Sequence, residues 1–222
     1  MPKVKIAPSF LTADIARLED EVRAVGAAGA DLLHLDVMDG HFVPPITFGQ
    51  LMIEAIRKIT SLPLDVHLMI EQPERHIESF ASAGSDILSV HIEACPNVRQ
   101  VLEQIKLLDK RAGVCISPQT PLSAIEHVLG EADQIVVMGV NPGWGGQQLI
   151  PETLPKIEQL RAILAERNVS PDIELDGGVK VANAGACVRA GASVLVAGSV
   201  VFNDEASVAD NMRALRHAIA SA

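Results

Sequence analysis

Hydrophobic and polar positions follow two spacings along the 222-residue chain. Short apolar runs rich in β-branched residues alternate with longer segments whose apolar residues recur at helical spacing. The short runs predict strands over residues 4–7, 32–37, 64–68, 87–91, 113–116, 134–138, 173–175 and 194–197. The longer segments predict helices over residues 14–29, 48–59, 98–109, 121–129, 151–167, 181–190 and 207–220, with a further helix that opens at Pro73.

The order of these elements predicts one α/β domain over residues 1–222. The βα units follow one another with no linker rich in Pro, Gly or Ser. Gly29, Gly84 and Gly191 each lie between a predicted helix and the next strand, where a left-handed residue ends a helix. A doubly wound open sheet would share this order. Eight units with candidate chemistry at many strand ends favour a closed TIM (β/α)8 barrel.

Composition narrows the classes of function. Hydrophobic residues make up 48% of the chain but aromatic residues only 3%, so we expect an aliphatic core, which suits buried parallel strands. The formal net charge is −10 and no basic cluster is present, which argues against a nucleic-acid partner. An anionic substrate would therefore have to be held by local dipoles and a metal, because the global field repels it.

The cysteines and the start of the chain indicate a reducing compartment. Cys95, Cys115 and Cys187 are odd in number and form no C-x-x-C pair, so we expect buried thiols rather than a disulfide framework or a structural zinc site. We find no signal peptide and no apolar stretch of membrane-spanning length. The expected location is the cytoplasm, with no membrane partner.

Four candidate metal ligands lie near the ends of three predicted strands. His34 and Asp36 are two residues apart in one strand, so their side chains point to the same face. His67 and Asp176 take comparable positions on other strands. Two histidines and two carboxylates suit one divalent ion such as zinc, iron(II), manganese or cobalt. A single histidine is more often a core residue, but the combination favours a metal site.

Three other polar residues near these strand ends each have two interpretations. His91 would either line a pocket or bond to backbone, and we expect the backbone bond. Asp39 and His41 would contact substrate or simply form a turn.

Three methionines also end predicted strands, in phase with the candidate ligands: Met38, Met69 and Met138. Methionine at such positions usually fills gaps in a core. Around a charged site these side chains would also exclude water and offer no acidic protons near a carbanion. We therefore treat them as candidate substrate contacts.

Glycine turns follow the last three predicted strands. They contain Gly143, Trp144, Gly145 and Gly146, then Gly177 and Gly178, then Gly198 and Ser199. Glycine allows backbone N–H groups to approach a ligand, and phosphate in such barrels often lies on the loops after the seventh and eighth strands. No lysine or arginine lies in these turns, so a phosphate would rest on main-chain donors and Ser199. Residues 200–202 would begin a short helix beside it.

These parts together suit proton transfer beside a carbonyl group. A divalent ion would stabilise the charge that develops on an ene-diolate. Asp36 and Asp176 come from the second and seventh strands. One would remove a proton from one face of a carbon, and the other would return a proton to the opposite face. The expected result is inversion at that carbon.

Six stretches of the chain resemble the ribulose-phosphate 3-epimerase family, over essentially its full length. They are residues 6–9 (IAPS), 34–44 (HLDVMDGHFVP), 65–69 (DVHLM), 141–147 (NPGWGGQ), 176–179 (DGGV) and 197–199 (AGS). The last two alone would indicate only a phosphate-binding barrel.

The resemblance implies a ribulose-phosphate-binding TIM barrel with one divalent metal per subunit. It implies interconversion of D-ribulose 5-phosphate and D-xylulose 5-phosphate in the pentose phosphate pathway, and assembly into homo-oligomers, either dimers or hexamers. By position, the metal ligands are His34, Asp36, His67 and Asp176, of which the two aspartates are the acid and base. The implied substrate contacts are Ser9, Met38, His67, Met69, Met138, Gly143, Trp144, Gly145, Gly146, Asp176, Gly177, Gly178, Gly198 and Ser199.

Three positions depart from the family's usual residues. Trp144 stands where phenylalanine is usual, Ser117 where asparagine is common, and Gly139 where serine or threonine is usual. None of them removes a ligand or an acid–base residue. A six-carbon ketose phosphate such as allulose 6-phosphate would use the same machinery and is the second candidate substrate. Two further functions stay open, a metal-dependent aldolase or lyase and a non-catalytic sugar-phosphate binder.

Overall fold

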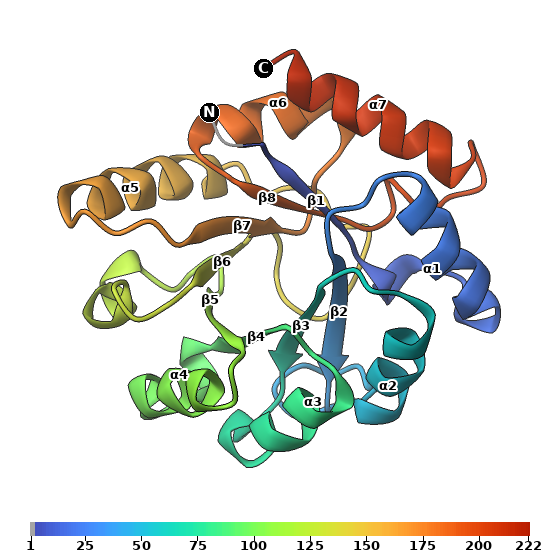
Figure 1. The fold of residues 1–222 in the computed structure, drawn as a ribbon. Helices are drawn as coiled ribbons and strands as arrows, with labels where there is room; N and C mark the ends of the chain where they lie inside the picture. The colour runs from blue at the N-terminus through green and yellow to red at the C-terminus, as the bar shows by residue number, and fades with distance from the viewer. Residues whose placement is uncertain (1–2) are drawn as a thin grey trace.

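In the part of the chain that the structure describes, eight parallel strands form one sheet that curves into a barrel, and helices surround it (Figure 1). The computed structural model describes residues 3–222, so the first two residues of the predicted domain lie outside the described residues. The strands are β1 (Lys5–Pro8), β2 (Leu33–Met38), β3 (Leu64–Met69), β4 (Ile87–His91), β5 (Arg111–Ile116), β6 (Gln134–Met138), β7 (Asp172–Asp176) and β8 (Val194–Ala197).

Seven α-helices and six short 3-10 turns connect the strands of the described residues. The helices are α1 (Leu18–Ala27), α2 (Gln50–Ile59), α3 (Ile77–Ala83), α4 (Val98–Leu107), α5 (Thr153–Glu166), α6 (Val181–Ala190) and α7 (Val208–Ala220). The 3-10 turns are η1 (Phe10–Thr12), η2 (Ile15–Arg17), η3 (Pro73–Arg75), η4 (Ile92–Ala94), η5 (Leu122–Ala124) and η6 (Glu126–Val128). No helix in this part of the chain is long and apolar enough to cross a membrane.

The strand order confirms the predicted barrel and excludes the open doubly wound sheet. Neighbours run β1-β8-β7-β6-β5-β4-β3-β2, so from β2 onward each strand pairs with its successor in sequence and β8 returns to β1. A parallel bridge between Ser9 and His34, together with a 3.1 Å hydrogen bond from Asp31 N to Ile6 O, joins β1 to β2. A sheet that meets itself leaves no free edge, and all strand C-termini reach one end of the barrel.

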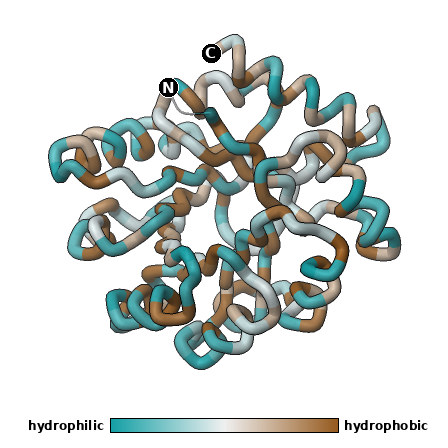
Figure 2. Tube along the Cα trace, in the orientation of Figure 1, coloured by the Kyte–Doolittle hydropathy of each residue, from teal (hydrophilic) through white to brown (hydrophobic). Residues whose placement is uncertain are grey.

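Alternation along each strand divides apolar from polar side chains. In β2, Leu33, Leu35 and Val37 belong to the large hydrophobic cluster shared with the helices, whereas His34 and Asp36 point into the barrel. The hydrophobic colour accordingly gathers on the central strands, and hydrophilic colour is strongest on the outer turns of the helices (Figure 2). The period of two therefore places the candidate chemistry inside the barrel.

Two predicted helices differ from the structure. The segment 14–29 contains η2 before α1, because the Asp14 carboxylate accepts a 3.0 Å bond from Ala16 N and Arg17 leaves the helical region at φ −120°. The segment 121–129 forms η5 and η6, with Ile125 at φ −109° and ψ −3° between them. In both cases apolar spacing predicts the buried face correctly but not the interruption of the backbone.

The predicted glycine endings are present. Gly84 and Gly191 are the C-caps of α3 and α6, at φ 113° and 129°. Gly29 follows α1 at φ 82°. These left-handed backbone values strain residues that carry a Cβ, which explains glycine at the three joints.

Candidate metal and substrate site

The four predicted metal ligands converge inside the barrel. Asp36 on β2 and His67 on β3 are register partners, and His34 lies one inward position earlier on β2. Asp176 reaches the same place from the end of β7. Both histidines are fully buried, and the aspartates are 3% and 7% exposed. Four polar side chains therefore lie together in a region that excludes most water.

The spacing of the donor atoms fits a divalent ion. Asp36 Oδ1 lies 3.2 Å from both His34 Nε2 and His67 Nδ1. Asp176 Oδ2 lies 3.6 Å and 3.2 Å from the same two nitrogens. Donors about 2.0–2.1 Å from a tetrahedral zinc ion lie roughly 3.3 Å from one another. All four atoms lie within 4.8 Å of each other, so the set can hold one ion.

Charge pairing within the cluster has a larger effect on the pKa values of its side chains than burial does. Burial by itself would raise the pKa of Asp36 and Asp176, but His34 and hydrogen bonds from both histidines hold each carboxyl pKa below its ordinary value. Burial would likewise lower the pKa of His34, but the two aspartates raise it well above the ordinary value. The cluster thus stabilises two ionised carboxylates side by side, which is also what a cation would require.

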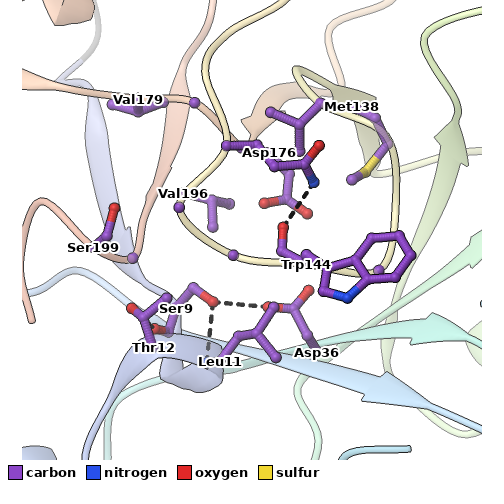
Figure 3. A pocket seen from close by; sticks show the side chains of 18 of the residues that line it. Ser9, Leu11, Thr12, Asp36, Met138, Trp144, Asp176, Val179, Val196 and Ser199 are labelled. Carbon is purple, nitrogen blue, oxygen red and sulfur yellow. Dashed lines mark hydrogen bonds between the residues drawn. The ribbon is translucent and has the colours of Figure 1, made fainter. Parts of the chain in front are cut away.

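A cavity opens on this cluster at the C-terminal end of the barrel (Figure 3). Ser9 Oγ donates a 2.7 Å hydrogen bond to Asp36 Oδ2, which leaves Oδ1 for the histidines. The predicted residues that line the cavity are Ser9, Asp36, Met38, Met69, Met138, Gly143, Trp144, Gly145, Gly146, Asp176, Gly177, Gly178, Gly198 and Ser199. His34 and His67 lie behind the carboxylates and do not line it, so the predicted substrate contact of His67 has no direct access.

The glycine turns form the far side of the cavity. Gly177 and Gly178 have φ values of 98° and 74°, which favour glycine. A Cβ on Gly178 would lie 2.5 Å from the backbone of Leu149, so these loops pack backbone against backbone. The predicted short helix after Ser199 is wrong: Val201 N and the next amide both bond to Gly198 O, and a turn results.

Sequence reasoning missed a cation beside these turns. Lys180 lines the cavity, and its Nζ donates a 2.7 Å hydrogen bond to Ser199 Oγ. Among the lining residues of the described chain it is the one lysine or arginine. The available signal was its position two residues after Gly178, close enough to the glycine turn for its side chain to reach the same cavity. A phosphate here would meet a positive side chain as well as main-chain donors.

Hydrogen bonds bear on two other expectations. The His91 side chain does not bond to backbone as expected: its ring bonds to His67 Nε2 at 2.9 Å and to Glu93 Oε2 at 3.0 Å. The Asp39 carboxylate accepts from the backbone N of His41 at 2.8 Å, which supports the turn interpretation. The three cysteines are free and buried, as predicted.

Comparisons with known proteins agree with this architecture. The model of the "Ribulose-phosphate 3 epimerase family" matches residues 5–202. The chain is 53% identical to the ribulose-phosphate 3-epimerase of Synechocystis sp., across 90% of this chain and 88% of the relative. It is 51% identical to that of Bacillus subtilis, across 90% and 92% of the two chains, and 43% identical to that of Escherichia coli strain K12, across 96% of each.

Solved structures of lower sequence similarity share the fold. KGPDC from Streptococcus mutans superposes with a TM-score of 0.73 at 12% identity, covering 99% of each chain. A 3-hexulose-6-phosphate synthase superposes with a TM-score of 0.69 at 21% identity, covering 98% of this chain and 99% of that one. At such identities the likeness concerns the barrel alone.

Proposed function

The chain belongs to the ribulose-phosphate 3-epimerase family and is an isomerase, and from this premise we propose that it interconverts D-ribulose 5-phosphate and D-xylulose 5-phosphate by two-base proton transfer at C3. The observation that carries the proposal is the placement of Asp36 and Asp176. They reach one cavity from β2 and β7 and share the same pair of histidines.

A divalent cation is the proposed cofactor, one per subunit, held by His34, Asp36, His67 and Asp176. The supporting observation is the donor spacing described above. When bound, the ion would supply positive charge that favours enolisation of the ketose. Zinc, iron(II), manganese and cobalt all accept this mixed donor set.

The aspartates would carry the protons. One carboxylate takes the proton from C3, and the electron pair of the broken C–H bond moves toward the neighbouring carbonyl to give an ene-diolate. The other carboxylate then protonates C3 from the opposite face, so the configuration inverts and no oxidation occurs. Ser9 keeps the outer oxygen of Asp36 hydrogen-bonded. Met38, Met69 and Met138 exclude water around the reacting carbon.

The remaining cavity suits a sugar phosphate. Gly143 to Gly146, Gly177, Gly178, Gly198 and Ser199 would bind the phosphate through backbone donors and the hydroxyl, with Trp144 over the sugar. Lys180 would add a charge-assisted hydrogen bond. This local cation offsets the net charge of −10, which otherwise repels an anion.

Two different reactions would use the same cluster. An epimerase of a six-carbon ketose phosphate would need only a longer sugar under Trp144, whose side chain is largely exposed at the mouth. A metal-dependent aldolase or lyase would also pass through an enolate but would change the carbon count. A pure binding protein would need no pair of carboxylates on one cavity.

We further propose a single catalytic domain over residues 1–222 that works in the cytoplasm as a dimer or hexamer. Two large apolar side chains that remain exposed between β2 and the first turn of α2, Ile46 at 79% and Leu51 at 83%, support an interface between copies. Light scattering of the purified chain tests the oligomeric state.

Turnover in D2O tests the proposed reaction. We expect D-ribulose 5-phosphate to yield D-xylulose 5-phosphate with deuterium at C3 and five carbons retained, and allulose 6-phosphate to react more slowly. Metal analysis of the same sample should give one ion per chain. Cleavage products would instead establish a lyase, and tight binding without any exchange would establish a binder.

A further inference from the structure

His91 is a buried histidine that the proposed reaction does not use. It ends β4, is fully buried and does not line the cavity. Its ring lies beside that of His67, with centroids 5.0 Å apart and planes 23° from parallel, and Phe42 covers it at 4.6 Å. A polar ring in this position needs partners for both nitrogens, and both partners are side chains.

The two hydrogen bonds of His91 form a chain that ends at the metal cluster. Glu93 Oε2 lies 3.0 Å from His91 Nδ1, and His91 Nε2 lies 2.9 Å from His67 Nε2. The other nitrogen of His67, Nδ1, faces the two aspartates at 3.2 Å. A line of contacts thus connects a carboxylate on η4 with a candidate metal ligand, and Cys115 Sγ lies within 4.8 Å of both histidines beside it.

The proton positions along this chain follow from its carboxylate end. Burial would raise the pKa of Glu93, but hydrogen bonds from His91, Thr120 and the Ser117 amide lower it to about 2. An ionised carboxylate only accepts hydrogen bonds, so His91 Nδ1 carries hydrogen. The two Nε2 atoms lie 2.9 Å apart, so one of them donates and the other accepts. When His91 is neutral and its single N–H is on Nδ1, toward Glu93, its Nε2 is the acceptor and His67 Nε2 is the donor. With a cation in the cluster, His67 Nδ1 then carries no hydrogen and offers its lone pair to that ion, in place of its hydrogen bonds to Asp36 and Asp176.

We propose that Glu93 and His91 are positioning residues that fix the tautomer of His67, so that Nδ1 is its metal-binding nitrogen. This inference rests on the metal site of the proposed function. It deepens that site because metal-bound histidines commonly donate their second N–H to a partner that holds the ring and raises its basicity. Here the carboxylate acts through an intervening imidazole.

The second histidine of the cluster, His34, directs its Nε2 rather than its Nδ1 toward the candidate metal site. His34 Nδ1 lies 2.9 Å from Asp65 Oδ2, and its Nε2 faces Asp36. Asp65 in turn accepts a 3.1 Å bond from Gln134 Nε2. The two histidines therefore present different nitrogens to one centre, and each choice is set by a carboxylate behind the ring.

Glu93 is anchored by a loop that lies outside the cavity. Its Oε1 accepts from Ser117 N at 2.8 Å and from the Thr120 hydroxyl. Lys156 on α5 donates to the carbonyls of Ser117 and Thr120 at 3.2 Å and 2.8 Å. The loop after β5 is thereby tied to α5, and the carboxylate has a fixed direction. Ser117, a departure from the family's usual residue, contributes its backbone rather than its side chain to this anchor.

The experiment is nitrogen-15 NMR of the zinc-loaded full-length chain with labelled histidine, together with zinc affinity by chelator competition. We expect His67 to show a metal-bound Nδ1 and a protonated Nε2, and His91 a protonated Nδ1 with no metal shift. Glu93→Gln should lower zinc affinity 10- to 100-fold and relax the His91 tautomer, because an amide can donate as well as accept. Glu78→Gln, at an exposed position on α3, is the matched control and should change neither quantity.

Each outcome decides the proposal. A metal-bound Nε2 on His67, a zinc affinity of Glu93→Gln within twofold of the control, or a second zinc ion held by His67, His91 and Cys115 would overturn it. If the variant fails to fold, the spectrum of the wild-type protein still shows which nitrogen of His67 and of His91 carries hydrogen. Failure of the wild type to bind zinc would overturn both the site and the inference. Zinc bound through Nδ1 in a protein without epimerase activity would overturn only the proposed reaction.

Discussion

Replacing each catalytic aspartate by asparagine separates the two halves of the proposed reaction. Asn keeps the shape and one oxygen of Asp36 or Asp176 but removes the proton acceptor. A positioned acid or base contributes about 10²–10⁴-fold to rate, which corresponds to roughly 2.7–5.4 kcal/mol of barrier at about 1.36 kcal/mol per tenfold. Each carboxylate also contacts both histidines at 3.6 Å or less, so metal affinity should fall as well. We expect net epimerisation to fall about 10²–10⁴-fold even when zinc saturates the variant.

Exchange of the C3 hydrogen with D2O, measured separately for the two pentulose phosphates, reveals which aspartate serves which face. In each variant one epimer should retain residual exchange, because the surviving carboxylate still reaches its own face. The epimer that exchanges should differ between Asp36→Asn and Asp176→Asn. Saturating zinc in the assay corrects for weaker metal binding.

The control is Asp109→Asn, at an exposed residue with φ 56° where asparagine is well tolerated. It should leave epimerisation and exchange unchanged. Near-normal turnover in either aspartate variant, or residual exchange of the same epimer in both, would refute the assignment of one carboxylate to each face.

Three further perturbations test the cavity and the fold. Lys180→Met should raise KM for the sugar phosphate about tenfold, or roughly 1.4 kcal/mol, with little change in kcat, because the lysine would contact only the phosphate. Asp172→Asn should lower the free energy of unfolding by about 1–3 kcal/mol at pH 7, because the Asp172 carboxylate bonds to Lys5 and Arg111 at 2.8 Å and 2.6 Å. These bonds lower the pKa of Asp172 in the folded state, so the difference from wild type should shrink below about pH 4 and vanish at lower pH. Gly178→Ala should cost at least about 1 kcal/mol of stability and weaken phosphate binding, because its Cβ would meet the Leu149 backbone at 2.5 Å.

Each of these has a measurement that can contradict it. A Lys180→Met enzyme whose KM and inhibition by inorganic phosphate match wild type would show that the lysine serves only Ser199. A pH-independent stability difference in urea unfolding would refute the charge argument for Asp172. Gly29→Ala has a similar backbone strain, at φ 82°, but no atom within 4 Å of its Cβ. Equal losses in Gly29→Ala and Gly178→Ala would show that strain alone, and not the close contact, is responsible.

The fold was predictable because its signals are local. Strand and helix differ in the spacing of apolar residues, and the alternation in β2 assigns His34 and Asp36 to one face without any knowledge of other strands. The chain interruptions at Arg17 and Ile125 were not predictable in this way, because apolar spacing reports which face is buried and not the dihedral angles of one residue.

The amino-acid sequence by itself determined the alternating βα order, the inward face of each strand and the residue types able to hold a metal. Tertiary structure alone decided which of them meet. The 3.2 Å approach of Asp176 to His67 spans strands that are far apart in sequence and exists only because the sheet closes. The hydrogen bond from Lys180 to Ser199 and the contact of His91 with His67 likewise depend on side-chain directions across neighbouring segments. Spacing along a chain fixes direction relative to the backbone, whereas distances between strands follow from closure and packing.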